Sequence, residues 1–415
     1  MPRSVVSLFT GAGGLDLGFE AGGFRTGVAV EMDAACVDTL RANRDWPVIH
    51  EDVLKVTSSE ILASAELPAG EIDLLIGGPP CQPFSKSGYW SRGDSRRLDD
   101  PRADTLAGYL RVLRDTQPRA FLLENVAGLN FKGKSEALDL LRDEVERINK
   151  SCGTRYGLEI IKLNAADFGV PQIRERVFIL GSREGRQFGR LDATHDWATT
   201  QSKGGEIVEP LPKLLEPYRS AWDAIGHLAD QKPSDDLAMR GKWAALLPSV
   251  PEGQNYLYHT DRGEGLPLFG WRRRFWNFLL KLAKDQPSWT LTAQPGPATG
   301  PFHWQNRHLS PRELARLQTF PDNYHLPESR IIAQKQIGNA VPSALAELLA
   351  LRIRSRFFGE TKLETAIPSL IPAKRDDCPV PEKVLRVRKS YRDLVGEHSA
   401  HPGTGLGYGA QRRAS

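Results

Sequence analysis

A cysteine that follows a short apolar run is the residue best placed for covalent chemistry in this sequence. The run Ile72–Ile76 predicts a buried strand, and Gly77-Gly78-Pro79-Pro80-Cys81-Gln82 follows it directly. The prolines stiffen this loop, because proline fixes its own φ and restricts the residue before it. A thiol held there can attack a substrate, whereas most cysteines in turns are only small apolar side chains. We favour the nucleophile, since ligands collect beyond the strand ends of open α/β sheets.

Three charged residues occur where they could act together with Cys81. Glu124 ends a second apolar run, residues 119–123, which predicts a neighbouring strand. A carboxylate at that place either caps a helix or takes part in chemistry, and the nearby Cys81 favours chemistry. Arg174 and Arg176 are two positions apart, so both side chains face one side of an extended segment. They indicate a solvated edge or a pair that holds a base edge or a phosphate.

Glycines after the first predicted strand, residues 5–9, indicate a nucleotide-binding loop. The loop reads Gly11-x-Gly13-Gly14, and the next predicted strand, residues 26–30, ends at Glu31. A carboxylate at that position can accept hydrogen bonds from ribose hydroxyls. The glycine spacing differs from the Gly-x-Gly-x-x-Gly of dinucleotide-binding proteins and leaves no glycine for a pyrophosphate. A ligand that contains adenosine without phosphates fits better.

The order of the predicted elements indicates a doubly wound α/β fold, because strands alternate with helices. The predicted strands are residues 5–9, 26–30, 48–50, 72–76, 119–123, 157–164 and 176–181, and the predicted helices are 34–43, 105–115, 136–149 and 344–356. Residues 182–301 lack this rhythm and are rich in Gly, Pro, Trp and Tyr. Within them, Phe269–Phe278 interleaves aromatic side chains with Arg272–Arg274, which indicates an amphipathic helix with a solvated basic stripe or a nucleic-acid-binding face.

Length and composition are those of an ordinary globular protein with two domains. The chain has 415 residues, 26% of them charged, with a net charge of +4. We expect a cytoplasmic protein, because no apolar run approaches the ~20 residues of a membrane helix and the first residues lack a signal peptide. Four cysteines make no disulfide framework, and no spacing typical of a zinc site occurs, so no metal is expected.

Taken together, these stretches resemble the DNA (cytosine-5) methyltransferases from Val5 to about Arg356. The motifs that carry the resemblance are Phe9-x-Gly11-x-Gly13-Gly14, Glu31, Asp52, Gly78-Pro79-Pro80-Cys81-Gln82, Glu124-Asn125-Val126, Gln172-x-Arg174-x-Arg176, Ser310-Pro311-Arg312-Glu313 and Gln336-x-Gly338-Asn339-x-Val341-Pro342. The order and spacing are what make the match specific. Ser7 departs from the pattern, since many members carry an acidic residue there.

The resemblance implies S-adenosyl-L-methionine as cofactor and a cytosine flipped out of double-stranded DNA as substrate. Cys81 would add to C6 of the base, and Glu124 would contact N3 in a protonated form that burial stabilises. Arg174 and Arg176 would hold the base and the charge of the adduct. The implied cofactor-binding residues are Phe9, Thr10, Gly11, Gly13, Gly14, Leu15, Glu31, Met32, Asp52, Val53, Gly78, Leu106, Asn339 and Val341.

The resemblance also implies the domain organisation. Residues 1–181 with 335–358 would form the Rossmann-like catalytic domain, 182–334 a smaller target-recognition domain, and 359–415 an extension with a disordered end. We expect a monomer that works in a restriction-modification or phage-defence system, beside cognate proteins of that system. Two alternatives are an RNA cytosine-5 methyltransferase, whose Cys-Phe-Thr signature this chain lacks, and a non-catalytic DNA-binding paralogue, against which the intact Cys81 and Glu124 argue.

Overall fold

The computed structural model of this protein describes residues 2–79, 103–126, 135–197, 215–228, 235–270 and 276–395. Cys81 and the basic segment Arg272–Arg274 lie outside these residues.

Seven strands form one sheet in the order β3-β2-β1-β4-β5-β7-β6. Their bounds are β1 (Arg3–Leu8), β2 (Phe24–Glu31), β3 (Val48–His50), β4 (Leu74–Gly77), β5 (Ala120–Val126), β6 (Glu159–Asn164) and β7 (Glu175–Ser182). The pairs among β1 to β5 are parallel, whereas β7 runs antiparallel between β5 and β6. The doubly wound α/β fold is therefore confirmed. The antiparallel β7 is a feature that the alternation of elements did not predict.

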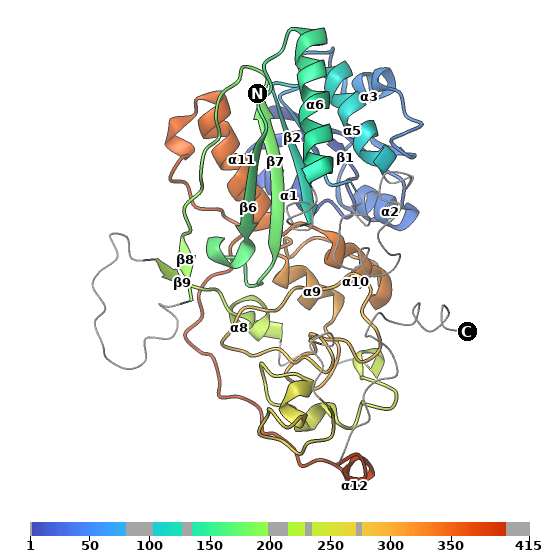
Figure 1. Ribbon diagram of the computed structural model, residues 1–415, viewed down its shortest axis with the longest axis vertical. Helices are drawn as coiled ribbons and strands as arrows, with labels where there is room; N and C mark the ends of the chain where they lie inside the picture. Colours follow the sequence, from blue (N-terminus) through green and yellow to red (C-terminus); the bar gives the residue numbers. More distant parts are fainter. Residues whose placement is uncertain are drawn as a thin grey trace.

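Helices cover both faces of this sheet (Figure 1). One face carries α1 (Gly14–Ala21) and α11 (Ser343–Phe358), and the other carries α3 (Ser58–Ala65), α5 (Ala103–Thr116) and α6 (Ser135–Cys152). A further helix, α2 (Ala34–Asn43), packs beside β2 and β3. Neighbouring residues divide between the faces as strand geometry requires, with Val5 in one core and Val6 in the other. Strands buried on both sides read as continuous apolar runs, which is why they were predictable.

A stripe of glycines lets α11, from the end of the chain, lie directly on α1. Gly14, Gly18 and Gly22 recur every fourth residue, so they share one face of the helix. A Cβ added at Gly18 would lie 2.2 Å from the Ser343 carbonyl oxygen, and one at Gly22 would lie 2.4 Å from the Ala350 Cβ. The glycines are thus required for the backbones of the two helices to approach this closely.

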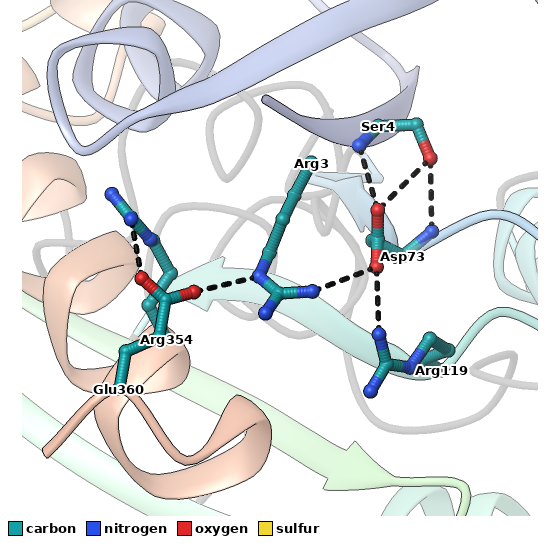
Figure 2. A network of polar contacts seen from close by, with 6 residues as sticks. All are labelled: Arg3, Ser4, Asp73, Arg119, Arg354 and Glu360. Atoms are coloured by element: carbon teal, nitrogen blue, oxygen red, sulfur yellow. Dashed lines mark hydrogen bonds and ion pairs between the residues drawn. The ribbon is translucent and has the colours of Figure 1, made fainter. Parts of the chain in front are cut away.

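A polar network lies at the edge of the sheet where the parallel strands begin (Figure 2). The Arg3 guanidinium donates to Glu360 Oε1 at 2.9 Å and to Asp73 Oδ1 at 3.2 Å, and Arg119 donates to the same Asp73 oxygen at 3.2 Å. Arg354 pairs with the other Glu360 oxygen. The network joins the starts of β1, β4 and β5 to the end of α11, far from the carboxyl ends of the strands.

The rest of the described chain forms a layer of short helices and a distal lobe, below the sheet in Figure 1. The layer contains α8 (Ala221–Ile225), α9 (Pro311–Leu317) and α10 (Arg330–Asn339), and a small two-stranded sheet, β8 (His195–Asp196) with β9 (Glu216–Pro217), lies beside it. We call residues 235–270 and 276–308 the distal lobe; its core includes Leu246, Leu279 and Phe302. Its 3₁₀ helices include Leu247–Ser249 and Tyr256–His259, and α12 (Lys389–Arg392) packs on it. Within the described ranges, no helix has both the length and the apolar character that a bilayer crossing requires.

Candidate functional site

A cavity of about 390 Å³ opens at the carboxyl ends of β1, β2, β4 and β5. This is the edge where parallel sheets bind ligands. The predicted residues that line it are Phe9, Thr10, Gly11, Gly14, Leu15, Glu31, Met32, Gly78, Glu124, Arg176, Asn339 and Val341. The residues predicted for a cofactor pocket and the predicted catalytic carboxylate therefore line the same cavity.

The loop after β1 passes the cavity in an unusual backbone conformation. Phe9 has φ 55°, Gly11 φ 58° and Gly13 φ 78°, all in the left-handed region. Glycine adopts this region at no steric cost, but a bulky residue such as Phe9 pays about 1–3 kcal/mol. Such strain persists only where the surrounding structure holds it, and it is concentrated at functional sites.

Glu31 holds the end of β2 against this loop. Its Oε2 accepts a hydrogen bond from the Gly11 amide at 2.7 Å, and its Oε1 accepts one from the Asp33 amide at 2.7 Å. Each carboxylate oxygen can accept a second bond, so Glu31 remains able to accept from ligand hydroxyls. These contacts orient the carboxylate before any ligand arrives.

Charges among the described lining residues argue against a phosphorylated ligand, because no unpaired cation is available there, although Asp33 and Glu124 are paired and burial raises the pKa of Asp16. Four carboxyl groups line the cavity, those of Asp16, Glu31, Asp33 and Glu124. The two cations among its described lining residues are each paired, Arg176 with Glu124 at 2.8 Å and Lys335 with Asp33 at 2.6 Å. Phosphates bind where free cations or aligned backbone amides await them, and these cations are already neutralised. Among the residues that the structure describes, none form a cluster of three or more side chains suited to a metal ion.

Glu124 and Arg176 form the buried ion pair of the site. They come from adjacent antiparallel strands, β5 and the start of β7, and their side chains are 12% and 11% exposed. Burial raises the pKa of Glu124, and the charge of Arg176 only partly opposes the rise. This direction agrees with the expected protonated carboxyl, whose role stays a prediction. The Gly78 backbone, three residues before Cys81, comes so close that a Cβ there would lie 2.9 Å from Glu124 Oε2.

Arg174 lies apart from Arg176, although the two are neighbours on one side of an extended segment. It is fully buried just before β7, and it is not among the residues that line the cavity. Its guanidinium donates to the carbonyl oxygens of Gly338 at 2.7 Å, Ala340 at 2.9 Å and Leu291 at 3.1 Å. These contacts make Arg174 a support for the wall formed by residues 338–341.

That wall comes from the far end of the chain. Gly338, Asn339 and Val341 line the cavity opposite the first glycine loop. The Gln336 amide donates to the Ala35 carbonyl oxygen at 2.8 Å and so fastens α10 to α2. The cavity is therefore complete only when residues 335–341 are docked.

Four predicted cofactor residues do not line the cavity: Gly13, Asp52, Val53 and Leu106. Gly13 is the left-handed N-cap of α1 and so shapes the loop. Asp52 Oδ1 accepts from the Leu54 amide at 3.0 Å, while Val53 and Leu106 pack in the core under α5. Their role in binding stays a prediction. Cys81 lies outside the described residues, between the described Pro79 and α5.

Asp16 is a cavity residue that the sequence reasoning missed. It is 1% exposed and accepts hydrogen bonds from Ser7 Oγ at 3.1 Å and Thr26 Oγ1 at 3.3 Å. Burial raises its pKa to about 7, and the charge of Glu20 adds to the rise. The only signal in the sequence was Ser7, which stands where many proteins with these motifs carry an acidic residue. Its hydroxyl contacts Asp16, so the carboxylate at this place comes from Asp16.

We expect Asp16→Asn to remove part of the pH dependence of stability. From about pH 4 to 7 an unfolded Asp16 ionises while the folded one stays protonated, so the native protein loses stability as pH rises through this range. The loss approaches about 4 kcal/mol, at 1.36 kcal/mol for each pKa unit. Denaturant unfolding at pH 5 and pH 8 measures the larger part of this loss, about 2.6 kcal/mol. An equal drop in wild type and variant would contradict the assignment.

Comparisons with known proteins agree on one family. A model of C-5 cytosine-specific DNA methylases matches residues 3–355. Type II methyltransferase M.SacI of Streptomyces achromogenes is 38% identical over 388 residues, which cover 88% of this chain and 96% of that protein. Type II methyltransferase M1.HphI of Haemophilus parahaemolyticus is 33% identical, with 84% and 86% covered. The crystal structure of S. pombe Dnmt2 methyltransferase shares the fold, with a TM-score of 0.55, 17% identity, and 85% and 98% covered.

Proposed function

Because the chain belongs to the C-5 cytosine-specific DNA methylase family, we propose that it methylates C5 of a flipped-out cytosine in a specific duplex DNA sequence, with S-adenosyl-L-methionine as donor and Cys81 as covalent nucleophile. The observation that carries this proposal is the buried Glu124–Arg176 pair, which lies in the same cavity as the nucleotide loop and against the backbone that leads to Cys81.

Two features of the cavity suit S-adenosyl-L-methionine. Glu31 can accept from ribose hydroxyls, and the two cations among the described lining residues are each paired, so neither is available to a phosphate. The residues that would hold the cofactor are the Phe9–Leu15 loop, Glu31, Met32, Asn339 and Val341. When bound, it supplies an electrophilic methyl group.

The residues of this chain would then act on the base in a fixed order. The Cys81 thiolate adds to C6 as Glu124 donates its proton to N3, which leaves electron density on C5. Once C5 carries the methyl group that the bound cofactor would supply, the C5 proton passes to water, the C5–C6 double bond re-forms as the Cys81 thiolate leaves, and the N3 proton returns to Glu124. Arg176 stays beside Glu124 and stabilises the carboxylate that forms when the proton is given up.

The DNA must bring the base to this cavity, because a cytosine inside a duplex cannot reach Cys81. We assign sequence reading to residues 182–334 and catalysis to residues 1–181 with 335–358. Since the curated relatives are Type II methyltransferases, we further propose that the enzyme protects DNA within a restriction or phage-defence system.

A duplex that carries 5-fluorocytosine tests the covalent step. Fluorine cannot leave as a proton does, so enzyme and DNA should stay joined after methyl transfer. We expect an SDS-resistant adduct only when S-adenosyl-L-methionine is present, and peptide mapping should place the DNA on Cys81.

Cys81→Ser is the matched control, because an alcohol lacks the accessible anion of a thiol near neutral pH. An adduct that survives this change, or one that maps to Cys36, Cys152 or Cys378, would refute the mechanism. Methyl transfer to tRNA in place of duplex DNA would instead favour the RNA enzyme.

A further inference from the structure

A long extended segment leaves α11 and crosses the molecule to the distal lobe. We call residues 360–395 the C-terminal strap; it is the red-orange trace that ends near α12 in Figure 1. The family model matches residues 3–355, so the strap lies beyond the residues that this model matches. Short helical turns occur only near its two ends, at Thr361–Leu363 and Lys389–Arg392.

The first anchor of the strap is on the catalytic part. Glu347, on α11 and 3% exposed, accepts from the Ser369 amide at 2.7 Å, the Ser369 hydroxyl at 2.8 Å and the Leu370 amide at 2.9 Å. Leu370 and Ile371 then pack against the core beneath α11. A buried carboxylate is costly unless its bonds are made, so the strap is what satisfies Glu347.

The second anchor is on the middle layer, at α8. Asp223 accepts from the Arg375 amide at 2.8 Å and pairs with Lys374 at 3.1 Å. The Trp222 indole N–H donates to Asp377 Oδ1 at 3.0 Å. The Asp223 side chain has no exposed surface. The strap is therefore held in register halfway along its course.

The third anchor is in the distal lobe. The Lys284 ammonium, 3% exposed, contacts Glu252 at 2.8 Å, Glu382 at 3.0 Å and the Val380 carbonyl oxygen at 3.2 Å. Farther on, Val387 and Tyr391 enter the lobe core, where Tyr391 stacks on Trp243 with ring centroids 6.1 Å apart. The lobe takes two of its core side chains from the strap.

We propose that the C-terminal strap is a positioning element that fixes the orientation of the distal lobe relative to the cavity, and hence the register of the target cytosine on the DNA. An extended chain cannot lengthen beyond about 3.3–3.6 Å per residue. The lobe contacts the catalytic part directly, for example where the Leu291 carbonyl oxygen accepts from Arg174, and the three buried anchors of the strap add a second connection that limits how far the lobe can shift. The expected effect on DNA rests on the proposed function, whereas the effect of the strap on the position of the lobe does not.

Removing the strap beyond its first anchor is the direct test. A chain that ends after Pro372 keeps the Glu347 contacts and loses those that the strap makes with Asp223 and Lys284, whereas a chain that ends after Val395 keeps them all and serves as control. We expect the shorter chain to bind S-adenosyl-L-methionine within twofold of wild type by calorimetry. Its KM for cognate duplex should rise at least tenfold, while kcat changes little.

A flexible segment inserted into the strap, which we call the slack insertion, tests positioning without removing any side chain from the core of the lobe. Six Gly/Ser residues after the exposed Cys378 leave every anchor intact but loosen the connection that the strap makes between the lobe and the catalytic part. The same insertion after Val395 is the matched control. We expect the first insertion alone to raise KM and to lower the discrimination between the cognate site and a one-base-pair mismatch by tenfold or more. Hydrogen exchange in residues 246–268 should stay as in wild type.

Three outcomes would overturn the proposal. They are an unchanged KM and discrimination with the slack insertion, a cofactor affinity that falls as much as the DNA affinity, and a lobe that loses protection together with the specificity. The last two would make the strap a source of general stability only. If the intact enzyme methylates no DNA, the proposed function fails. The strap is then tested by labels on the lobe and the catalytic part, whose distance distribution should broaden with the slack insertion and not with its control.

Discussion

Replacing Glu124 with glutamine is expected to slow methyl transfer by about 10²–10⁴-fold, the usual contribution of a positioned acid or base. An amide can still form a hydrogen bond with N3, but it cannot deliver a proton. The variant should be less stable, because Arg176 loses its buried counter-charge, but the glutamine oxygen can still accept from Arg176 and a thermal melt should show that the protein folds. Single-turnover kinetics with saturating cofactor measures the chemical step.

The matched control is Glu175→Gln, an exposed carboxylate of β7 that pairs with Lys162 outside the cavity. It should transfer methyl groups at the wild-type rate. The pH profile adds a second readout: since the protonated form of Glu124 donates, the wild-type rate should fall as pH rises through its raised pKa, and Glu124→Gln should lack that limb. A loss below tenfold, or the same limb in the variant, would remove Glu124 from the chemistry.

Gly18→Ala is expected to destabilise the protein although alanine favours helices. The added Cβ would lie 2.2 Å from the Ser343 carbonyl oxygen, so α11 must move away from α1. Overpacking of this kind costs about 1–3 kcal/mol, which exceeds the ~0.5–1 kcal/mol that alanine gains over glycine in a helix. Because α11 directly follows the wall at Asn339 and Val341, cofactor affinity should fall as well.

Gly157→Ala makes the same chemical change where the new Cβ meets no atom within 4 Å. Denaturant unfolding and calorimetry with S-adenosyl-L-methionine should show wild-type behaviour for this control. If Gly18→Ala is as stable as Gly157→Ala, the close approach of the two helices does not hold the wall in place.

The strands of the sheet were predicted from the sequence more completely than the helices that connect them. Residues 48–50 and 34–43 form β3 and α2 with the predicted bounds, because apolar runs and helical periods are local signals. Helix α3 was missed although Thr57 and Glu60 form its capping box, a pattern that is readable from sequence. Helix α10 has no clear apolar face, so no period marked it. The antiparallel direction of β7 depends on pairing partners that no local pattern encodes.

In the site too, local patterns predicted the place of some residues and not of others. Phe9, Glu31 and Asn339 line one cavity, because strand ends and motif spacing locate them, and their role in binding stays a prediction. Arg174 and Arg176 are indistinguishable by spacing. They separate because Arg174 finds carbonyl oxygens more than a hundred residues away, whereas Arg176 finds Glu124 across the β5–β7 pair. Side-chain partners of that kind are set by the fold as a whole.

The docking of the chain's last helices onto its first ones has a consequence for synthesis. The Gln336–Ala35 bond joins residues 301 positions apart, and the glycine stripe of α1 has no partner until α11 exists. At about 5–20 residues per second, a ribosome needs roughly 15–60 s to make that intervening length. During that time the nascent chain carries a nucleotide loop without its closing wall. We therefore expect a half-made copy of this protein to leave the cavity open, so that ligand binding begins only after residues 335–358 are made.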